Sequence, residues 1–546
     1  MQGLMQDWPL LVHKVLEHAN NHHAEQEIVS RAVEGGIHRY TYGELYKRSK
    51  RCAKALQKLG VKQGDVVATL AWNTYRHVEA WYGIMGLGAV CHTLNPRLFP
   101  EQLVYIANHA EDKYLFTDLT FVPLVEKLAP LCPSIKGVII LTDRAHMPKT
   151  ALTNAICYED LIADVDDDFE WVQVDENDAA GMCYTSGTTG NPKGVVYSHR
   201  SNILHALMVC QADVMGIRAI DSVLPVVPMF HANAWAIAFA APLVGAKLVM
   251  PGAQMDGASI HELLETEKVT FTAAVPTVWL MLLQFLEGQD KKLTTLKKVA
   301  IGGSALPKTI LDKFEQNYGV QVTHSWGMTE MSPVGTMAWP NATSVKDTKD
   351  SQERLKLKQG RAPFLVEMKI IDDDGKELPR DGEKFGHLVV RGPAIAKSYF
   401  KGEGGNILDK QGFFDTGDVA HIDRHGFMQI TDRSKDVIKS GGEWISSIEI
   451  ENIAVGHPEV AEAAVIGVPH PKWDERPLLV IIRKPNTSVT KEAILKFLEG
   501  KIAKWWMPDD VAFVTEIPHT ATGKIQKRTL REQFQGHVMT ADPTRS

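Results

Sequence analysis

The sequence predicts an α/β fold with a large N-terminal part, built on mostly parallel sheets, and a small α+β part at the C-terminus. Helical and strand patterns alternate through roughly the first 300 residues, which is typical of parallel sheets. Past about residue 360, short strands separated by Gly and Asp turns replace this alternation, and the texture changes again after Asp432. The chain has 546 residues, longer than one hydrophobic core usually grows, so we expect at least two domains.

The N-terminal elements begin with a helix, a strand and a second helix. Residues 42–59 have a helical pattern, residues 66–71 form an apolar strand and residues 75–86 are helical again. Short apolar strands then recur at 114–116, 138–141, 247–250 and 299–301. Because strands alternate with helices, we expect them to pair in parallel.

A β-rich subdomain is predicted over about 360–431, where strand patterns occur at 368–375 and 387–391. The segment just before it, 344–358, is charged and helix-prone, which is typical of a solvated surface element. These features place the N-terminal domain over residues 1–431.

The C-terminal domain is predicted to span residues 432–546. Strand patterns occur near 462–467 and 478–482, and a helical pattern covers 491–503. We therefore expect a compact α+β unit in this part of the chain.

Composition excludes several classes of protein. An apolar content of 44% and a charged content of 23% are ordinary for a soluble globular protein, and a net charge of −7 gives no footprint for nucleic acid. The six cysteines form no CxxC pair, so neither a zinc site nor a disulfide framework is indicated, and a reducing cytoplasm fits best. The N-terminus shows no secretory signal pattern, and the charge-free stretch 222–246 contains three prolines, so no transmembrane segment is expected.

The segment 185–194, Thr-Ser-Gly-Thr-Thr-Gly-Asn-Pro-Lys-Gly, combines glycines, hydroxyls and one lysine directly after an apolar run. Glycines allow backbone N–H groups to approach an anion, hydroxyls add donors and the lysine adds charge, so this composition suits a polyphosphate. It is not a Walker A loop, because Pro192 stands where that motif needs its second glycine. By composition alone, a surface turn is an equal alternative.

This segment resembles the phosphate loop of the adenylate-forming superfamily, which includes acyl-CoA synthetases, firefly luciferase and the adenylation domains of peptide synthetases. Further motifs of the superfamily follow in the expected order along nearly the whole chain. They are Pro-Met-Phe-His at 228–231, Gly-Gly-Ser-Ala at 302–305, Trp-Gly-Met-Thr-Glu at 326–330, Thr-Gly-Asp at 416–418, Asp-Arg-Ser-Lys-Asp at 432–436, Ser-Gly-Gly-Glu at 440–443 and Thr-Gly-Lys at 522–524. The resemblance implies an AMP-forming acid:CoA ligase with ATP and coenzyme A as co-substrates and Mg²⁺ as cofactor.

The carboxylic acid substrate is already ionised at neutral pH, since its pKa is about 4, so attack on the α-phosphate needs no general base. Positioning and charge stabilisation are required instead. Lys524 resembles the superfamily lysine that reaches the carboxylate and the α-phosphate during adenylation. Glu330 resembles the magnesium ligand, with Thr185 as its usual partner, and both offer the hard oxygen donors that magnesium prefers.

The resemblance also implies a nucleotide site. Trp326 stands where an aromatic residue stacks on adenine, although tyrosine is more usual there, and Asp418 resembles the carboxylate that binds both ribose hydroxyls, assisted by Arg433. Lys435, Lys439 and Trp444 resemble residues that line the adenylate pocket in fatty acyl-CoA synthetases. The remaining predicted ATP-binding residues are Ser186, Gly187, Thr188, Thr189, Gly190, Lys193, Gly302, Gly303, Ser304, Ala305, Gly327, Met328 and Thr329.

Asp432 stands where the superfamily has a hinge between its large and small domains. A hinge is needed because Lys524 must reach the α-phosphate in the first half-reaction and then leave, so that the coenzyme A thiol can approach. In the resemblance, the residues that then face the site and border the pantetheine tunnel are Ser440, Gly441, Gly442, Glu443 and Trp444.

His231 matches a histidine near the substrate carboxylate in fatty acyl-CoA synthetases; a core histidine is the alternative. Peptide-synthetase domains carry an aspartate just after this position, where this chain has Ala232, so an amino-acid substrate is not expected. The predicted acyl wall is mainly apolar and favours a monocarboxylic acid. Besides His231, it consists of Trp235, Val275, Gly302, Met331 and Pro333.

The amino-acid sequence is similar to bacterial medium- and long-chain fatty acyl-CoA synthetases and equally similar to 3-methylmercaptopropionate-CoA ligases. A luciferase-like oxygenase and a non-catalytic nucleotide-binding homologue are the competing hypotheses. The second predicts loss of charged site residues, yet Lys193, Glu330, Asp418, Arg433 and Lys524 are all present. Related fatty acyl-CoA synthetases are often dimers, so a homodimer is the state to test.

Overall fold

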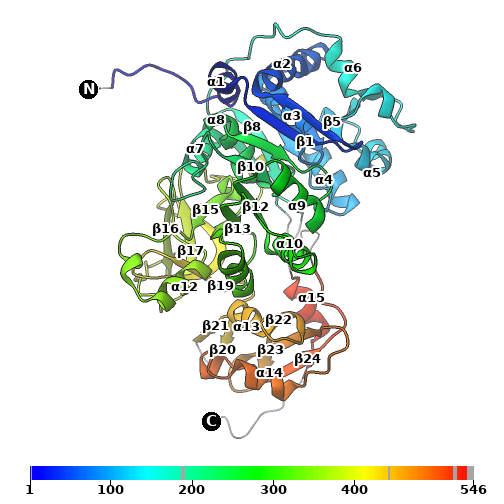
Figure 1. Ribbon diagram of the computed structural model, residues 1–546. Coiled ribbons are helices and arrows are strands. Elements are labelled where there is room, and N and C mark those ends of the chain that lie inside the picture. The colour runs from blue at the N-terminus through cyan, green and yellow to red at the C-terminus, as the bar shows by residue number, and fades with distance from the viewer. Residues whose placement is uncertain (2, 186–190, 441–442, 520–524, 538–546) are drawn as a thin grey trace.

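The computed structural model describes residues 1, 3–185, 191–440, 443–519 and 525–537. Figure 1 shows the two large sheets and their helices gathered in one body, with the elements from β20 to α15 as a compact group at the opposite end. The N-terminal segment from residue 3 to residue 8 is exposed and extends away from the body as an arm (Figure 1). Among the described helices, none is long and apolar enough to cross a lipid bilayer.

The larger sheet has eight strands in the order β15-β14-β13-β12-β10-β11-β1-β2. Its central strands pair in parallel, whereas the edge pairs β14–β15 and β1–β2 are antiparallel. The strands are β1 (Glu27–Arg31), β2 (Ile37–Thr41), β10 (Ser222–Pro225), β11 (Lys247–Met250), β12 (Phe271–Ala274), β13 (Lys298–Ile301), β14 (Gln321–Gly327) and β15 (Val334–Met337). Parallel pairing of the central strands confirms the predicted α/β class.

The second sheet has seven strands in the order β7-β6-β5-β3-β4-β8-β9, and only its last pair is antiparallel. The strands are β3 (Val66–Leu70), β4 (Val90–Thr93), β5 (Tyr114–Thr117), β6 (Gly137–Ile140), β7 (Ala155–Cys157), β8 (Ala179–Tyr184) and β9 (Gly194–Ser198). The β8–β9 hairpin carries the predicted phosphate loop at its tip.

Helices cover both sheets and join them through one shared core. Apolar residues of both sheets, such as Phe116 and Phe271, belong to this core together with α2, α3 and α8. All twelve residues of α3 are buried, as expected of a helix packed on every side. The helices before the small sheets are α1 (His13–His23), α2 (Tyr42–Lys58), α3 (Tyr75–Gly86), α4 (Pro100–Ala110), α5 (Val122–Leu128), α6 (Tyr158–Ala163), α7 (His199–Val209), α8 (Ile237–Val244), α9 (Gly257–Thr266), α10 (Pro276–Gly288), α11 (Lys308–Asp312) and α12 (Lys349–Leu357).

Two smaller sheets follow. The first is an antiparallel sheet of β16 (Glu367–Ile371), β17 (Gly386–Arg391), β18 (Phe414–Ile422) and β19 (Met428–Arg433). The second contains β20 (Ile438–Ser440), β21 (Glu443–Ile445), β22 (Val460–His470), β23 (Asp474–Arg483) and β24 (Asp510–Phe513). Helices α13 (Ser447–Val455), α14 (Lys491–Leu498) and α15 (Lys527–Gln533) accompany it. Two hydrophobic clusters of this last group contain only residues from Ile438 onward.

The helix predicted at 491–503 is shorter than expected and ends at Leu498. Gly500 adopts a positive φ of 70°, a conformation that glycine tolerates and that commonly terminates helices. The predicted surface segment 344–358 contains α12, whose last turn packs through the buried Leu355.

Candidate active site

The predicted phosphate loop spans the tip of the β8–β9 hairpin. Thr185 directly follows β8 and Lys193 directly precedes β9, and Tyr184 pairs with Gly194 across the hairpin. The Thr185 amide donates to the Lys193 carbonyl at 2.9 Å, and the Lys193 amide donates to the Thr185 hydroxyl at 3.2 Å. These bonds fix the base of the loop. Its central residues, Ser186, Gly187, Thr188, Thr189 and Gly190, lie outside the described residues.

Tyr399 connects this loop to Glu330. The Lys193 ammonium lies 4.9 Å from the centre of the Tyr399 ring, and the Tyr399 hydroxyl donates to Glu330 Oε1 at 2.7 Å. Burial, together with the Glu330 carboxylate, raises the pKa of the Tyr399 hydroxyl, so this group stays a donor at neutral pH. Tyr399 was not predicted as a site residue, because it belongs to none of the motifs.

Glu330 is buried in the short turn Thr329–Met331 after β14, with 6% of its surface exposed. The turn is held from two sides, since the Tyr197 hydroxyl of β9 donates to the Thr329 carbonyl at 2.7 Å and the Ala396 amide donates to the Glu330 carbonyl at 2.8 Å. A carboxylate held in this way, together with the Thr185 hydroxyl, supplies the hard oxygen donors that suit Mg²⁺. The residues present therefore fit the predicted ion.

Trp326 and Asp418 meet although they lie 92 residues apart. The Trp326 indole Nε1 donates to Asp418 Oδ2 at 3.1 Å, and both side chains are buried. Asp418 on β18 pairs with Arg433 on β19, and their side chains form an ion pair at 3.2 Å. Arg433 also donates to the Thr416 carbonyl at 2.9 Å. The structure thus brings the predicted adenine and ribose residues together.

The predicted nucleotide residues around 302–305 and 326–328 occupy neighbouring strand ends. The first group follows β13 and the second ends β14, and these two strands pair in parallel. Ligand sites commonly form at such carboxyl ends. Gly303 has a φ of 84°, and a Cβ on Gly327 would lie 2.0 Å from the Pro333 carbonyl oxygen, so both positions require glycine. The Ser304 carbonyl oxygen, one residue before Ala305, lies 3.3 Å from His324 Nε2. The Met328 amide donates to the Pro333 carbonyl.

The predicted acyl-wall residues Trp235 and Val275 come to the same strand end. A Cβ placed on Gly302 would lie 3.0 Å from Trp235 Cη2, and a Cβ on Gly303 would lie 3.1 Å from Val275 Cγ1. Met331 packs beside Gly335 of β15, because its methyl group would lie 2.6 Å from a Cβ on that residue. The indole of Trp235 therefore reaches the glycine pair after β13.

Trp235 sits in an unusual turn. All five residues from Ala232 to Ala236 have positive φ values, between 44° and 63°, so the segment forms a left-handed turn. L-residues pay roughly 1–2 kcal/mol each for this conformation, so surrounding contacts must hold it. One such contact is the bond from Asn233 Nδ2 to Asn202 Oδ1 at 3.2 Å. His231 directly precedes the turn and is partly buried, with its amide donating to the Pro228 carbonyl.

Asn73 is a residue that the sequence analysis missed. Its fully buried amide group donates to the Pro225 and Val227 carbonyls at 2.8 and 2.9 Å and accepts from the Met229 amide at 2.6 Å. One side chain thus fixes the segment that leads to His231. A single asparagine before a helix is typical of an ordinary helix cap, so this role was not predictable from the sequence.

The predicted C-terminal site residues are only partly described. Lys439 lies with its ammonium 5.5 Å from the Trp444 ring, which in turn meets His387 of β17 edge to face at 5.9 Å. Ser440 is buried and its hydroxyl lies 3.3 Å from Arg476 Nη1, while Lys435 is exposed in the turn after β19. Gly441, Gly442 and Lys524 lie outside the described residues, and Glu443 is described only as the start of β21.

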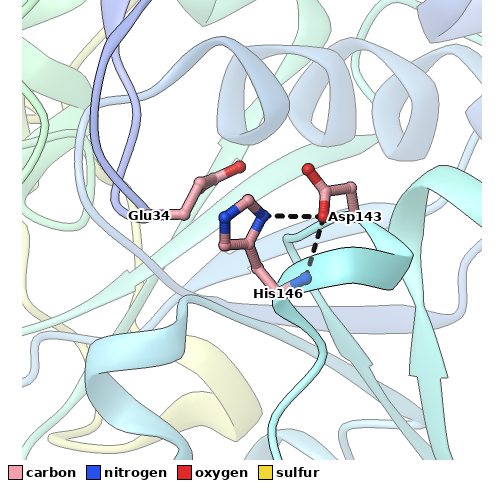
Figure 2. A group of neighbouring side chains, drawn as sticks. All are labelled: Glu34, Asp143 and His146. Carbon is pink, nitrogen blue, oxygen red and sulfur yellow. Dashed lines mark hydrogen bonds and ion pairs between the residues drawn. The ribbon is translucent and has the colours of Figure 1, made fainter.

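Among the residues that the structure describes, one group of three side chains is spaced for a metal ion: Glu34, Asp143 and His146 (Figure 2). Asp143 caps the turn Arg144–His146 by accepting from the His146 amide at 3.0 Å, and it also pairs with the His146 ring. Glu34 Oε1 accepts from Arg76 Nη1 at 2.6 Å. These contacts account for the group, and the neighbouring guanidinium disfavours a cation.

A cavity of about 510 Å³ opens in the β16–β19 sheet region, lined by Arg361, Lys369, Arg380 and Phe413 among others. None of the predicted site residues lines it. The candidate site is therefore defined by the convergence of the motifs rather than by this cavity.

Comparisons with known proteins agree with this convergence. The family model of the AMP-binding enzyme matches residues 16–400, and that of the AMP-binding enzyme C-terminal domain matches residues 449–524. A 3-methylmercaptopropionyl-CoA ligase of Ruegeria lacuscaerulensis is 48% identical over 535 residues, covering 98% of this chain and 99% of that protein. A medium-chain-fatty-acid–CoA ligase of Ectopseudomonas oleovorans is 46% identical over 534 residues, covering 98% of each.

A solved structure of an anthranilate CoA ligase in complex with anthranoyl-AMP has a TM-score of 0.84 to this chain at 26% identity, covering 97% of this chain and 99% of that one. Its fold extends over both the large sheets and the C-terminal group of elements. The chain belongs to the AMP-binding enzyme family and is an AMP-forming acyl-CoA synthetase of the adenylate-forming superfamily.

Proposed function

We propose that this ligase activates an apolar monocarboxylic acid, either a fatty acid or 3-methylmercaptopropionate. The observation that carries the proposal is the meeting of Trp235, Val275 and Gly302 beside the nucleotide motifs, since this wall offers no partner for a second charge. Ala232 stands where a carboxylate would be needed to hold a substrate ammonium. The relatives at 48% and 46% identity are named for these two acid classes and support both equally.

In the first half-reaction, a carboxylate oxygen of the acid bonds to the α-phosphorus of ATP while the bond to the pyrophosphate oxygen breaks. Trp326, Asp418 and Arg433 orient the adenosine, and Lys193 and the loop 185–190 bind the phosphates. Glu330 and Thr185 would hold Mg²⁺, which supplies positive charge next to the phosphates. Lys524 stabilises the charge that develops between the carboxylate and the α-phosphate.

His231 is assigned to the substrate carboxylate, and Asn73 sets the position of the segment leading to it. Pro333 and Met331 extend the acyl wall from the turn that carries Glu330.

In the second half-reaction, the thiol of coenzyme A loses its proton to solvent and its sulfur bonds to the acyl carbon, while the bond from that carbon to the phosphate oxygen breaks and AMP leaves. For this step the C-terminal domain, residues 432–546, turns relative to residues 1–431 about Asp432. The segment 440–444 then borders the thiol channel, while Lys435 and Lys439 contact the adenylate.

Two variants test the assignment of the half-reactions. Lys524→Ala should abolish acid-dependent pyrophosphate exchange and spare thioester formation from supplied acyl-adenylate, whereas Gly441→Trp should do the reverse. Equal loss of both half-reactions in Lys524→Ala contradicts the assignment.

A pyrophosphate-release screen identifies the acid. It covers acids from acetate to palmitate together with 3-methylmercaptopropionate, an aryl acid and amino acids. A preference for amino acids contradicts the prediction, drawn from Ala232, that the substrate is not an amino acid.

The proposal also covers the cellular location and the oligomeric state of the protein. Six free cysteines fit a reducing cytoplasm. Leu4, Met5 and Trp8 of the N-terminal arm are exposed, at 89%, 87% and 61%, which supports burial against a second copy in a homodimer. Light scattering after gel filtration, with and without residues 1–8, tests this state.

A further inference from the structure

Two ion pairs connect the last described helix, α15, to the predicted hinge residue Asp432 and to the turn that follows it. On α15, Lys527 lies 3.7 Å from Asp432 Oδ1, and Arg531 donates to Asp436 Oδ1. The two basic residues are four apart on one helix face, and the two acidic residues are also four apart. This matched spacing lets segment 432–436 lie along α15 with both ends held.

The inner pair is deeply buried and shares its partners with helix α13. The Lys527 ammonium donates to the Ser447 hydroxyl and contacts Glu451 Oε1 at 2.9 Å, and the Ser447 hydroxyl donates to Asp432 Oδ2. The Asp432 and Lys527 side chains are only 2% and 9% exposed. Buried charges of this kind are strongly destabilising when one partner is lost, so the contacts fix the relative positions of their elements.

The turn itself adds backbone bonds. The amides of Asp436 and Val437 both donate to the Arg433 carbonyl, at 2.8 and 2.9 Å. The segment after Asp432 is therefore a closed turn rather than an extended linker. Asp432 and Arg433 also pair with Val419 and Asp418 of β18.

We propose that Lys527 and Arg531 are positioning residues that hold helix α15 against segment 432–436 and thereby set the position of α15 relative to β18. This inference rests on the proposed function, in which Lys524 serves adenylation and the chain turns about Asp432. Lys527 follows Lys524 by three residues in the sequence. The clasp, defined as Asp432, Asp436, Ser447, Lys527 and Arg531, therefore fixes the segment that follows Lys524 relative to the predicted hinge residue.

The coenzyme A segment has a separate support. Ser440 pairs with Asp474 of β23, and its hydroxyl meets Arg476, which is itself paired with Asp509 at 2.8 Å. None of these contacts involves α15. Loosening the clasp should therefore impair adenylation more than thioester formation.

Arg531→Ala and Ser447→Ala test the outer and inner parts of the clasp. Each should lower acid-dependent pyrophosphate exchange about 10-fold or more, because displacement of a reacting group by about 1 Å has effects of this size. Thioester formation from supplied acyl-adenylate should fall less than about 3-fold. Arg528→Ala is the matched control, because Arg528 lies on the same helix, is exposed and, among the described residues, forms its ion pair with Glu532.

The exchanged pair, Asp436→Arg with Arg531→Asp, should recover exchange to within about 3-fold of the unaltered protein, as expected of two directly coupled residues. Equal loss of both half-reactions in Arg531→Ala, or no recovery in the exchanged pair, overturns the proposal. Circular dichroism and Tm confirm that each variant is folded. If Lys524→Ala abolishes exchange while Arg531→Ala and Ser447→Ala behave like Arg528→Ala, the clasp alone is refuted; if Lys524→Ala retains exchange, the proposed function fails first.

Discussion

The Trp326 indole donates a hydrogen bond to the Asp418 carboxylate at 3.1 Å, and this bond joins the end of β14 to β18 in a different sheet. Neither residue can move without affecting the other. The surface assigned to adenine and the carboxylate assigned to the ribose are therefore positioned together.

Trp326→Phe keeps an aromatic ring but removes the donor to Asp418. We expect the KM for ATP to rise about 10-fold, since a hydrogen bond to a charged group contributes about 1.5–3 kcal/mol. Steady-state kinetics with varied ATP measures this. Asp418→Asn and the double variant complete a cycle, and strictly additive effects contradict the coupling.

Tyr399→Phe removes the hydroxyl that donates to Glu330 at 2.7 Å. Groups that orient a metal ligand typically change metal affinity or activity by about 10–100-fold. We expect the Mg²⁺ concentration for half-maximal pyrophosphate release to rise about 10-fold at fixed ATP. Tyr105→Phe is the control, because Tyr105 donates to Glu403 instead; an equal shift in both variants refutes the assignment.

Trp235→Ala removes the indole that reaches Gly302. The kcat/KM for palmitate should rise at least about 10-fold relative to hexanoate, because one methylene in an apolar pocket contributes about 1–3 kcal/mol. Pyrophosphate release with the acid series measures the ratio. An unchanged ratio shows that Trp235 does not limit the chain length.

Asn73→Ala leaves the Met229 amide and two carbonyls without their partner. Buried groups left unpaired cost about 1–3 kcal/mol each, so Tm should fall by several degrees and kcat should fall as the segment before His231 loosens. Differential scanning calorimetry and kinetics give both values. The exposed Asn21→Ala should change neither, and a silent Asn73→Ala contradicts the positioning role.

Stability should decline in acid because of buried histidines. Burial lowers the pKa of His205 from 6.5 to about 4, and its Nε2 accepts from the Val334 amide at 3.0 Å, so the folded protein holds it neutral. The unfolded chain binds this proton below about pH 6.5. His205 therefore contributes its full stability above that pH and loses it as the pH falls toward 4, by about 3 kcal/mol.

The measurement is Tm between pH 7.5 and pH 4.5. His205→Gln should lose less Tm over this range than the unaltered protein, because it removes one titrating group. The exposed His22→Gln should follow the unaltered protein. Parallel curves for His205→Gln and the unaltered protein contradict the role of His205.

The strand and helix order was predictable because each element carries its own periodicity. The alternating elements from 42 to 86 and the strand at 299–301 appear where the sequence placed them, within one or two residues. The end of α14 was wrong because a single glycine, Gly500, decided it. Periodicity reports which face is buried but not where a backbone turns.

The motif residues were predictable because several polar residues stand close together in each motif. Tyr399, Asn73 and Lys527 were missed, since each stands alone in an ordinary segment and acquires its role only from partners far away in the chain. Glu330, for example, gives a sequence signal, whereas the tyrosine 69 residues later that orients it gives none. Long-range partnership is set by packing and has no local pattern.

The left-handed turn at 232–236 makes the neighbourhood of Trp235 a place where glycine relieves backbone strain. Glycine adopts such a φ without steric cost, so Ala234→Gly should relieve strain of about 1 kcal/mol, which offsets the loss of its fully buried methyl group. With glycine at position 234, the turn would also adopt other backbone conformations more easily. The range of accepted acids can then be changed at this one turn with little loss of stability, whereas such changes usually lower stability in enzyme engineering.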